Sequence, residues 1–431
     1  MSPGACAWTA RPSGVIAPTG GRSSPTYPAA ETATTETTKR VAPATRETTT
    51  HRTPGPLGRR GGNYGHPVPR LSFGRALLAS LALAAAGCAG TADRPLTSGT
   101  SGTSGTSGKV LRAPGADDRA TLTGAGSTFA APMVREWIDQ YRRVAPGVTV
   151  EYKSSGSVSG VEALGSSAVD FAVSEVPLGD VLAGGDQRSP ALEVPCLAGA
   201  VAVAYNLPGV SGLQLSAVTL AGIFSGRITR WDDPSVRAEN EGRELPRTEI
   251  RVVHRSDRSG TTQAFTQFLR DAAPDAWSLG AGPTVSWPAG AAVEGSEALV
   301  VAVKQTVGAI GYTAASYVPG AGLGTAAIGN RAGRFVGPTA EAVNAAVSRA
   351  NPAAPGAYPI ATVSFLVLSP SGRDEAKVAA LRHFAAWALS EGQRSAERLG
   401  YAPVPEPQLV NALSMVMTIG GNGPGRTEAG P

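Results

Sequence analysis

Cysteine and histidine, which most often build covalent cross-links and metal centres, are scarce in this 431-residue chain. The three cysteines, Cys6, Cys88 and Cys196, are too few and too scattered for a disulfide framework. The four histidines show no pair at metal-ligand spacing, so we expect no metal and no other cofactor. No apolar run reaches the ~18 residues that a membrane-spanning helix needs. Disulfide scaffolds, metal centres and membrane-spanning helices are therefore not expected.

The net charge of +5 belongs to the N-terminal stretch of the chain. Residues 1–70 hold nine of the 38 Lys and Arg residues and three of the 33 Asp and Glu residues. The other 29 basic and 30 acidic residues give residues 71–431 a net charge of −1. Because a nucleic-acid-binding domain needs a basic surface, we expect this body to bind no nucleic acid.

Residues 1–69 are polar and rich in Pro and Gly, with no apolar repeat of period 2 or 3.6. Such a segment cannot bury enough surface to offset the entropy of ordering it. We therefore expect 1–69 to be a disordered extension, or to lie upstream of the true translation start.

A different composition begins at residue 70. Arg70 and Arg75 precede the apolar run Ala76–Ala86, so residues 70–87 are predicted to be a secretory signal peptide. Cys88 follows Ala85-Ala86-Gly87, which resembles the bacterial lipobox and implies lipidation of Cys88. Ala85 stands where that motif usually has Leu, and the alternative is ordinary cleavage nearby with an unmodified Cys88. The protein is expected to be exported to the periplasm or cell surface, with a lipid anchor at Cys88.

Two further segments are expected to lack a fixed structure. Residues 88–119 contain TSG repeated four times at 97–108, and such repeats behave as flexible coil. We interpret them as a tether between the anchor and a folded body. The Gly-rich residues 418–431 are predicted to be a disordered tail.

The body between these segments alternates strand-like and helix-like patterns, which favours an α/β fold with largely parallel sheets. Cys196 lies in an apolar run and is expected to be a buried free thiol. Predicted strands cover Val148–Tyr152, Val169–Val173, Ala200–Tyr205, Ile250–His254 and Val363–Leu368, and predicted helices cover Pro132–Val144, Thr261–Arg270, Glu297–Gln305, Glu341–Ala350 and Glu375–Leu389.

Three predicted strand-to-helix loops combine glycine with hydroxyl side chains. They cover Gly124–Phe129, Ser154–Gly160 and Ser256–Thr262, and the third follows Arg255. Such a loop directs backbone N–H groups and hydroxyls outward, at the positive end of a helix dipole. The alternative is that these Ser and Thr residues only cap their helices. Three such loops in one chain favour a shared oxyanion site.

At these loops the body resembles the phosphate-binding proteins of bacterial high-affinity phosphate ABC importers, the PstS-like family. The resemblance covers about residues 120–415. The matching stretches are Leu122–Pro132, Ser154–Val161, Val169–Leu178, Leu220–Pro234, Val252–Phe265, Thr284–Pro288 and Val307–Tyr312.

The resemblance implies a type II periplasmic binding protein fold, in which two α/β domains hold the ligand in the cleft between them. Domain I would comprise 120–206 and 365–417, and domain II would comprise 207–364. The chain would cross between them near Tyr205-Asn206 and Ser364-Phe365.

The resemblance also implies which residues bind phosphate. Arg255 would make the charged contact, Asp257 would hold Arg255 in place, and Arg258 is expected to face solvent at the cleft rim. The uncharged contacts would come from Thr128, Phe129, Ser157, Ser259, Gly260 and Thr261.

Glu175 stands where the family has an Asp. A carboxylate in an anion site can accept the hydrogen bond of a protonated phosphate oxygen, whereas sulfate offers no proton and would be repelled. The extra methylene of Glu175 therefore bears on selectivity more than on the fold. The alternative interpretation of Glu175 is a surface carboxylate at a strand end.

Enzyme motifs are missing from the chain. It has no G-x-x-x-x-G-K-[ST] phosphate loop and no G-x-S-x-G nucleophile elbow, so we expect no enzyme activity. The function implied by the resemblance is capture of inorganic phosphate by a monomer, and its delivery to permease subunits with a cytoplasmic ATPase. The alternatives are a binding protein for sulfate, molybdate or tungstate, and a phosphate-sensing surface lipoprotein that is not coupled to transport.

Overall fold

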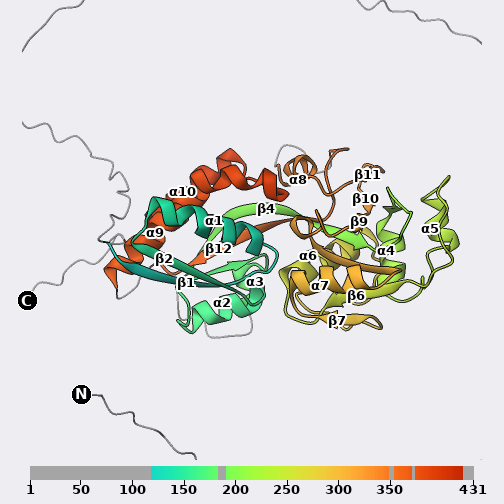
Figure 1. The fold of residues 1–431 in the computed structure, drawn as a ribbon, viewed down its shortest axis with the longest axis horizontal. Helices are drawn as coiled ribbons and strands as arrows, with labels where there is room; N and C mark the ends of the chain where they lie inside the picture. Colours follow the sequence, from blue (N-terminus) through green and yellow to red (C-terminus); the bar gives the residue numbers. More distant parts are fainter. Residues whose placement is uncertain (1–117, 183–190, 349–353, 371–373, 421–431) are drawn as a thin grey trace, which may run out of the picture. The chain divides into compact units, whose positions relative to one another are not determined.

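The computed structural model describes residues 118–182, 191–348, 354–370 and 374–420 (Figure 1). The predicted extension 1–69, the signal peptide 70–87, Cys88 and nearly all of the tether 88–119 lie outside the described residues, as do residues 421–431. In the described ranges no helix is long and apolar enough to cross a membrane. Ile419 is fully buried, so the predicted start of the tail at Thr418 is too early in the sequence.

One long strand connects two halves of the described chain. Strand β4 (Leu192–Tyr205) pairs with β12 (Ala361–Leu368) as far as Ala200, and with β8 (Ala309–Ala314) from Val201 onward. We call the described residues 118–182, 191–200, 361–370 and 374–420 the first lobe, and the described residues 201–348 and 354–360 the second lobe. Figure 1 shows β4 running from one lobe into the other. The partner change lies a few residues before the crossing predicted at Tyr205-Asn206.

Each lobe contains further strands and helices besides β4, β8 and β12. The first lobe contains β1 (Ala120–Gly126), α1 (Ala131–Val144), β2 (Val148–Ser154), α2 (Ser157–Gly165), β3 (Phe171–Ser174), α3 (Leu178–Leu182), α9 (Glu375–Leu389), the 3-10 helices η2 (Glu391–Ser395) and η3 (Glu397–Leu399), β13 (Tyr401–Ala402) and α10 (Glu406–Met417). The second lobe contains β5 (Gln214–Leu215), α4 (Ala217–Phe224), α5 (Pro234–Ala238), β6 (Arg251–Arg255), α6 (Gly260–Ala272), β7 (Ala291–Val293), α7 (Gly295–Gln305), η1 (Ala315–Tyr317), β9 (Gly324–Thr325), β10 (Ala327–Gly329), β11 (Phe335–Val336) and α8 (Ala340–Val347).

The main sheet runs through both lobes in the order β2-β1-β3-β12-β4-β8-β6-β7, and β13 and β9 also pair with β4. The outer pairs, β1 with β2 and β3, and β6 with β7 and β8, are parallel. The central pairs of β12 with β3 and β4, and of β4 with β8, are antiparallel. The α/β class is confirmed, but the expectation of largely parallel sheets is wrong for this centre.

Most predicted elements occur with ends shifted by a few residues. Helix α1 shows why such an element can be predicted from the sequence: Met133, Trp137 and Tyr141 are spaced one turn apart and are all buried. Pro132 opens the helix, where its missing N–H costs no hydrogen bond. The main errors lie in β4, which is much longer than the predicted Ala200–Tyr205, and in elements that no pattern predicted, among them β8, α4 and α10.

Two glycines allow α2 to lie against the end of β1. A Cβ on Gly160 of α2 would lie 2.3 Å from the Cα of Gly126 and 2.7 Å from the carbonyl oxygen of Ala125. Gly126 itself has a φ of 131°, which side-chain-bearing residues rarely adopt. The first residues of α2 therefore come close to the loop after β1.

We expect Gly160→Ala to lower the free energy of unfolding by roughly 1–3 kcal/mol, because the added methyl overpacks this contact. The matched control is Gly165→Ala in the same helix, where no atom lies within 4 Å of the added Cβ. Alanine is the better helix former, so this control should be neutral or stabilising by up to about 1 kcal/mol. Urea unfolding measures both variants, and equal stability of the two would contradict the close approach.

Candidate functional site

Four helices begin in one place between the lobes. Helices α1 and α2 come from the first lobe, and α6 and α7 come from the second. The Gly260 N–H of α6 donates to Ser157 Oγ of α2 at 3.2 Å, and the Thr128 and Ser296 hydroxyls lie 3.0 Å apart. Because helix N-termini carry partial positive charge and unpaired N–H groups, their convergence favours an anion.

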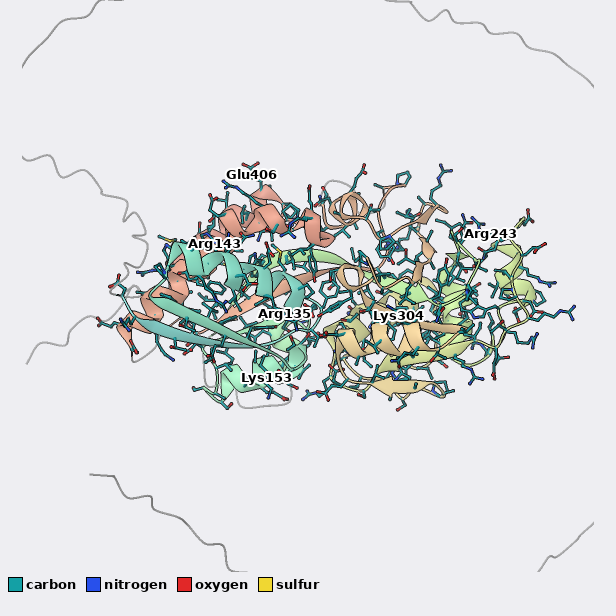
Figure 2. All side chains as sticks on the ribbon, in the orientation of Figure 1. Arg135, Arg143, Lys153, Arg243, Lys304 and Glu406 are labelled. Atoms are coloured by element: carbon teal, nitrogen blue, oxygen red, sulfur yellow. The ribbon has the colours of Figure 1, made fainter. Side chains whose placement is uncertain are left out.

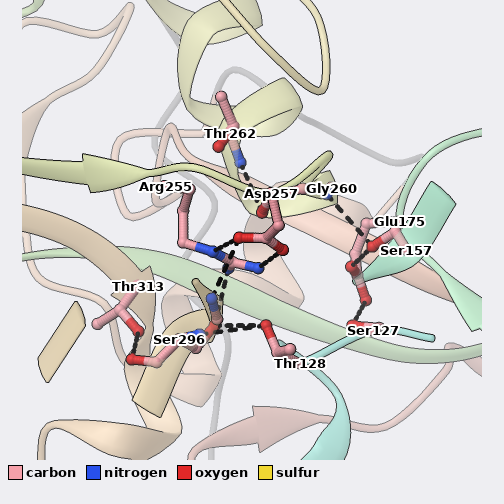
Figure 3. A network of polar contacts seen from close by, with 12 residues as sticks. Ser127, Thr128, Ser157, Glu175, Arg255, Asp257, Gly260, Thr262, Ser296 and Thr313 are labelled. Carbon is pink, nitrogen blue, oxygen red and sulfur yellow. Dashed lines mark hydrogen bonds and ion pairs between the residues drawn. The ribbon is translucent and has the colours of Figure 1, made fainter. Parts of the chain in front are cut away.

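Arg255 supplies the full positive charge of this region. It ends β6 and is 4% exposed. Its Nε donates to Asp257 Oδ1 at 2.6 Å, its Nη2 pairs with Asp257 Oδ2, and its Nη1 donates to Ser296 Oγ at 3.2 Å (Figure 3). Asp257 also accepts the Gly295 N–H at 3.1 Å. The guanidinium is thus fixed in orientation by a carboxylate that is itself held by α7.

The pKa of Asp257 reflects this pairing. Burial by itself raises the pKa, but the hydrogen bonds and charge of Arg255 outweigh burial, so the pKa lies below its usual range. Asp257 therefore remains ionised beside Arg255, which it must do to fix the orientation of the guanidinium.

Glu175 supplies a buried carboxyl group at the same place. It follows β3 and is 6% exposed, so the surface-carboxylate alternative is wrong. Ser127 Oγ and Ser364 Oγ donate to its Oε1 at 2.6 and 2.7 Å, and Ser157 Oγ donates to its Oε2 at 2.8 Å. Burial raises the pKa of Glu175, although these three hydroxyls and the charge of Arg255 oppose the rise.

The start of α6 closes against this carboxyl group. A Cβ on Gly260 would lie 2.7 Å from Glu175 Oε2 and 2.7 Å from Ser157 Oγ, so any side chain there would displace these two polar groups. Ser259 caps α6 by accepting the Thr262 N–H at 3.3 Å. Ser259 and Thr261 are both 1% exposed. The capping alternative therefore describes Ser259 well, but it does not account for the contact of Gly260 with Ser157.

The residues predicted for the site come together from both lobes. Thr128 contacts Ser296 and through it Arg255, while Ser157 joins Glu175 to Gly260 (Figure 3). The Phe129 side chain is buried against the ring of Tyr401, with centroids 5.9 Å apart, which leaves its backbone as the part beside the site.

Three serines that contact Glu175 or Arg255 were not predicted from the sequence. Ser127 lies inside the first predicted loop, and Ser296 follows Gly295 at the start of α7. Glycine followed by a hydroxyl at a helix start is the same pattern as in the three predicted loops, so it could have revealed Ser296. Ser364 lies within β12, where no local pattern distinguishes it from other strand residues.

Two exposed ion pairs also connect the lobes. Arg258 pairs with Glu162 of α2, and Arg135 lies 3.8 Å from Glu297 of α7. Figure 2 shows Arg135 beside the junction of the lobes. Arg258 is half-exposed, as expected at a rim, but it is bound to a carboxylate rather than only to solvent. Exposed pairs of this kind contribute at most about 1 kcal/mol each.

Other reactive side chains lie outside this network. Cys196 is a buried free thiol, as predicted, and burial raises its pKa. His254 stacks on Trp287 with ring centroids 5.1 Å apart, and burial lowers its pKa. The described part of the chain has no group of three or more His, Cys, Asp or Glu side chains that could hold a metal ion.

Comparisons with known proteins agree on one family. The PBP superfamily domain matches residues 111–392. "Phosphate-binding protein PstS" of Methanocaldococcus jannaschii is 36% identical over 334 residues, which cover 68% of this chain and 85% of that protein. "Phosphate-binding protein PstS" of Xylella fastidiosa is 33% identical over 310 residues, which cover 68% and 83%.

Solved structures show the same fold at lower identity. The phosphate-binding protein from Stenotrophomonas maltophilia is 20% identical with a TM-score of 0.54, and the match covers 69% of this chain and 94% of that one. A high-affinity periplasmic phosphate-binding protein solved with phosphate is 23% identical with a TM-score of 0.56, covering 68% and 93%. The type II periplasmic binding protein architecture expected from the sequence is confirmed by these matches.

Proposed function

This chain belongs to the PBP superfamily and, within it, to the PstS-like phosphate-binding proteins, and from that premise we propose that it captures inorganic phosphate outside the cytoplasmic membrane and delivers it to an ABC-type permease. The observation that carries the proposal is the meeting of Arg255, four helix N-termini and Glu175 between two lobes. This arrangement offers both donors for anionic oxygens and one acceptor for a protonated oxygen.

The donors would hold a dehydrated anion. Charge-assisted hydrogen bonds are shorter and stronger than neutral ones, and Arg255 is already buried and fixed by Asp257. We assign phosphate contacts to Thr128, Phe129, Ser157, Glu175, Arg255, Ser259, Gly260 and Thr261, with Asp257 positioning Arg255.

Glu175 would distinguish phosphate from sulfate. In its ionised form Glu175 would accept the hydrogen bond of a protonated phosphate oxygen, whereas a sulfate oxygen would face it without a proton between them. The three serine hydroxyls that hold Glu175 would compensate for its extra methylene by fixing where the carboxylate stands.

Phosphate would also act as the bridge between domain I (120–206 and 365–417) and domain II (207–364). A ligand favours the closed arrangement only through contacts that the open one lacks. Thr128, Ser157 and Glu175 on one side, and Arg255 and the start of α6 on the other, would supply those contacts. The loaded monomer would then dock on permease subunits with a cytoplasmic ATPase, and no chemical turnover forms part of this proposal.

For Arg255→Ala we expect phosphate affinity to fall about 10- to 150-fold, because a charged hydrogen bond of about 1.5–3 kcal/mol is lost. Isothermal titration of the full chain measures the effect, and urea unfolding confirms that the variant folds. Arg251→Ala is the matched control, because Arg251 lies at the other end of β6 and pairs at 2.8 Å with Glu249. Near-native phosphate affinity of Arg255→Ala would refute the assignment.

For Glu175→Gln we expect the ratio of phosphate affinity to sulfate affinity to fall roughly 5- to 150-fold, because the amide can donate a hydrogen bond to a sulfate oxygen. Competition calorimetry with phosphate, arsenate, sulfate, molybdate and tungstate measures the ratio. The control is Glu151→Gln, an exposed carboxylate on β2. An unchanged ratio of phosphate affinity to sulfate affinity would disprove the role of Glu175. If the native chain preferred another oxyanion, that anion and not phosphate would be its ligand.

We further propose that Cys88 carries a lipid and that residues 88–119 tether the body near its permease, which raises its effective concentration there. Cys88→Ser should move the protein from the membrane fraction to the soluble fraction of the cell envelope. Cys6→Ser, the other cysteine ahead of the body, should leave the distribution unchanged. Membrane retention of Cys88→Ser would exclude this anchor.

Loss of phosphate uptake in a strain lacking the chain would separate transport from sensing alone.

A further inference from the structure

Three tyrosine hydroxyls donate to three consecutive backbone carbonyls of the loop between β1 and α1. Tyr152 donates to the Ser127 carbonyl at 2.9 Å and Tyr317 to the Thr128 carbonyl at 2.9 Å. Tyr401 donates to the next carbonyl, that of Phe129, at 2.5 Å. The tyrosines belong to β2, η1 and β13, so three separate segments of the chain hold one short loop.

The three tyrosine hydrogen bonds set the direction of the backbone N–H groups in this loop. A trans peptide is planar, and its N–H points opposite to its carbonyl. Each of the N–H groups of Thr128, Phe129 and Ala130 therefore points away from the tyrosine that donates to the carbonyl of the same peptide. The Ala130 N–H donates to Ser127 Oγ at 3.0 Å, and that hydroxyl donates to Glu175. The Ala130 N–H thus lies on the side of the buried site.

The three tyrosine hydroxyls remain protonated and can therefore always donate these hydrogen bonds at neutral pH. Burial raises the pKa of Tyr317 to about 12 and holds the pKa of Tyr152 and Tyr401 well above the usual value, so all three stay protonated at neutral pH. The Tyr401 hydroxyl also lies 2.7 Å from Ser316 Oγ. Because Ser316 and Tyr317 both belong to η1, the second lobe takes part in holding a loop of the first.

We propose that Tyr152, Tyr317 and Tyr401 are positioning residues that fix the peptide planes of residues 127–130, so that the N–H groups of Thr128 and Phe129 are aimed at the bound anion. This inference rests on the proposed phosphate-binding function and adds how its backbone donors are oriented. Tyr317 orients the peptide whose N–H belongs to Phe129, and Tyr152 orients the peptide whose N–H belongs to Thr128.

The test is phosphate titration of the full chain carrying Tyr317→Phe or Tyr152→Phe. Each variant removes one net hydrogen bond that orients the loop, so we expect phosphate affinity to fall about 2- to 10-fold. Tyr358→Phe is the matched control, because the buried Tyr358 hydroxyl also donates to a backbone carbonyl, that of Val201, at 2.8 Å. Its affinity should remain native.

A spectroscopic signal separates positioning from a merely structural role. The chain contains a single Thr-Phe dipeptide, Thr128-Phe129, so ¹³C-carbonyl threonine with ¹⁵N-phenylalanine isolates the Phe129 amide. Phosphate should shift this amide proton downfield in the native chain and in Tyr358→Phe, and the shift should shrink in Tyr317→Phe.

Native affinity of Tyr317→Phe and Tyr152→Phe, or weakened binding with an unchanged Phe129 shift, would overturn the inference while leaving the proposed function intact. Failure of the native chain itself to bind phosphate would overturn the proposed function and this inference with it.

Discussion

Two buried ionisable groups, the guanidinium of Arg255 and the carboxyl group of Glu175, impose the main constraint on this molecule. A charge removed from water must be paired or hydrogen-bonded, or its burial is too costly. Asp257 and Ser296 meet this need for Arg255, and three serine hydroxyls meet it for Glu175. The glycines beside them serve the same constraint, because these partners can reach the two groups only where backbones come close together. The loops and helix starts between the lobes are arranged around these two groups.

Much of the site could be predicted because its chemistry is local in the sequence. A glycine and a hydroxyl after a strand identify a helix start, and Arg255 directly precedes one such loop. Ser157, Ser259, Gly260 and Thr261 could be named on those grounds together with the family resemblance. The same local pattern at Gly295-Ser296 would have extended the prediction to α7.

Other parts depend on contacts that no local pattern encodes. Ser364 reaches Glu175 because β12 lies beside β3, and the two residues are far apart in the chain. The tyrosines around the first loop come from three distant segments, and each would pass for an ordinary aromatic residue of the core. The central antiparallel pairing of β4, β8 and β12 was missed because alternation of strands and helices predicts parallel neighbours. Periodicity identifies elements, but it does not say which strands become neighbours.

Strand β4 has a mechanical consequence for a two-lobed molecule. It is one continuous strand whose hydrogen bonds tie it to β12 in the first lobe and to β8 in the second. Relative movement of the lobes must therefore bend or twist paired backbone rather than swing on loose linkers. In any opening of the cleft proposed above, this connection would limit the amplitude of the movement and keep the lobes in register, as an elastic joint does.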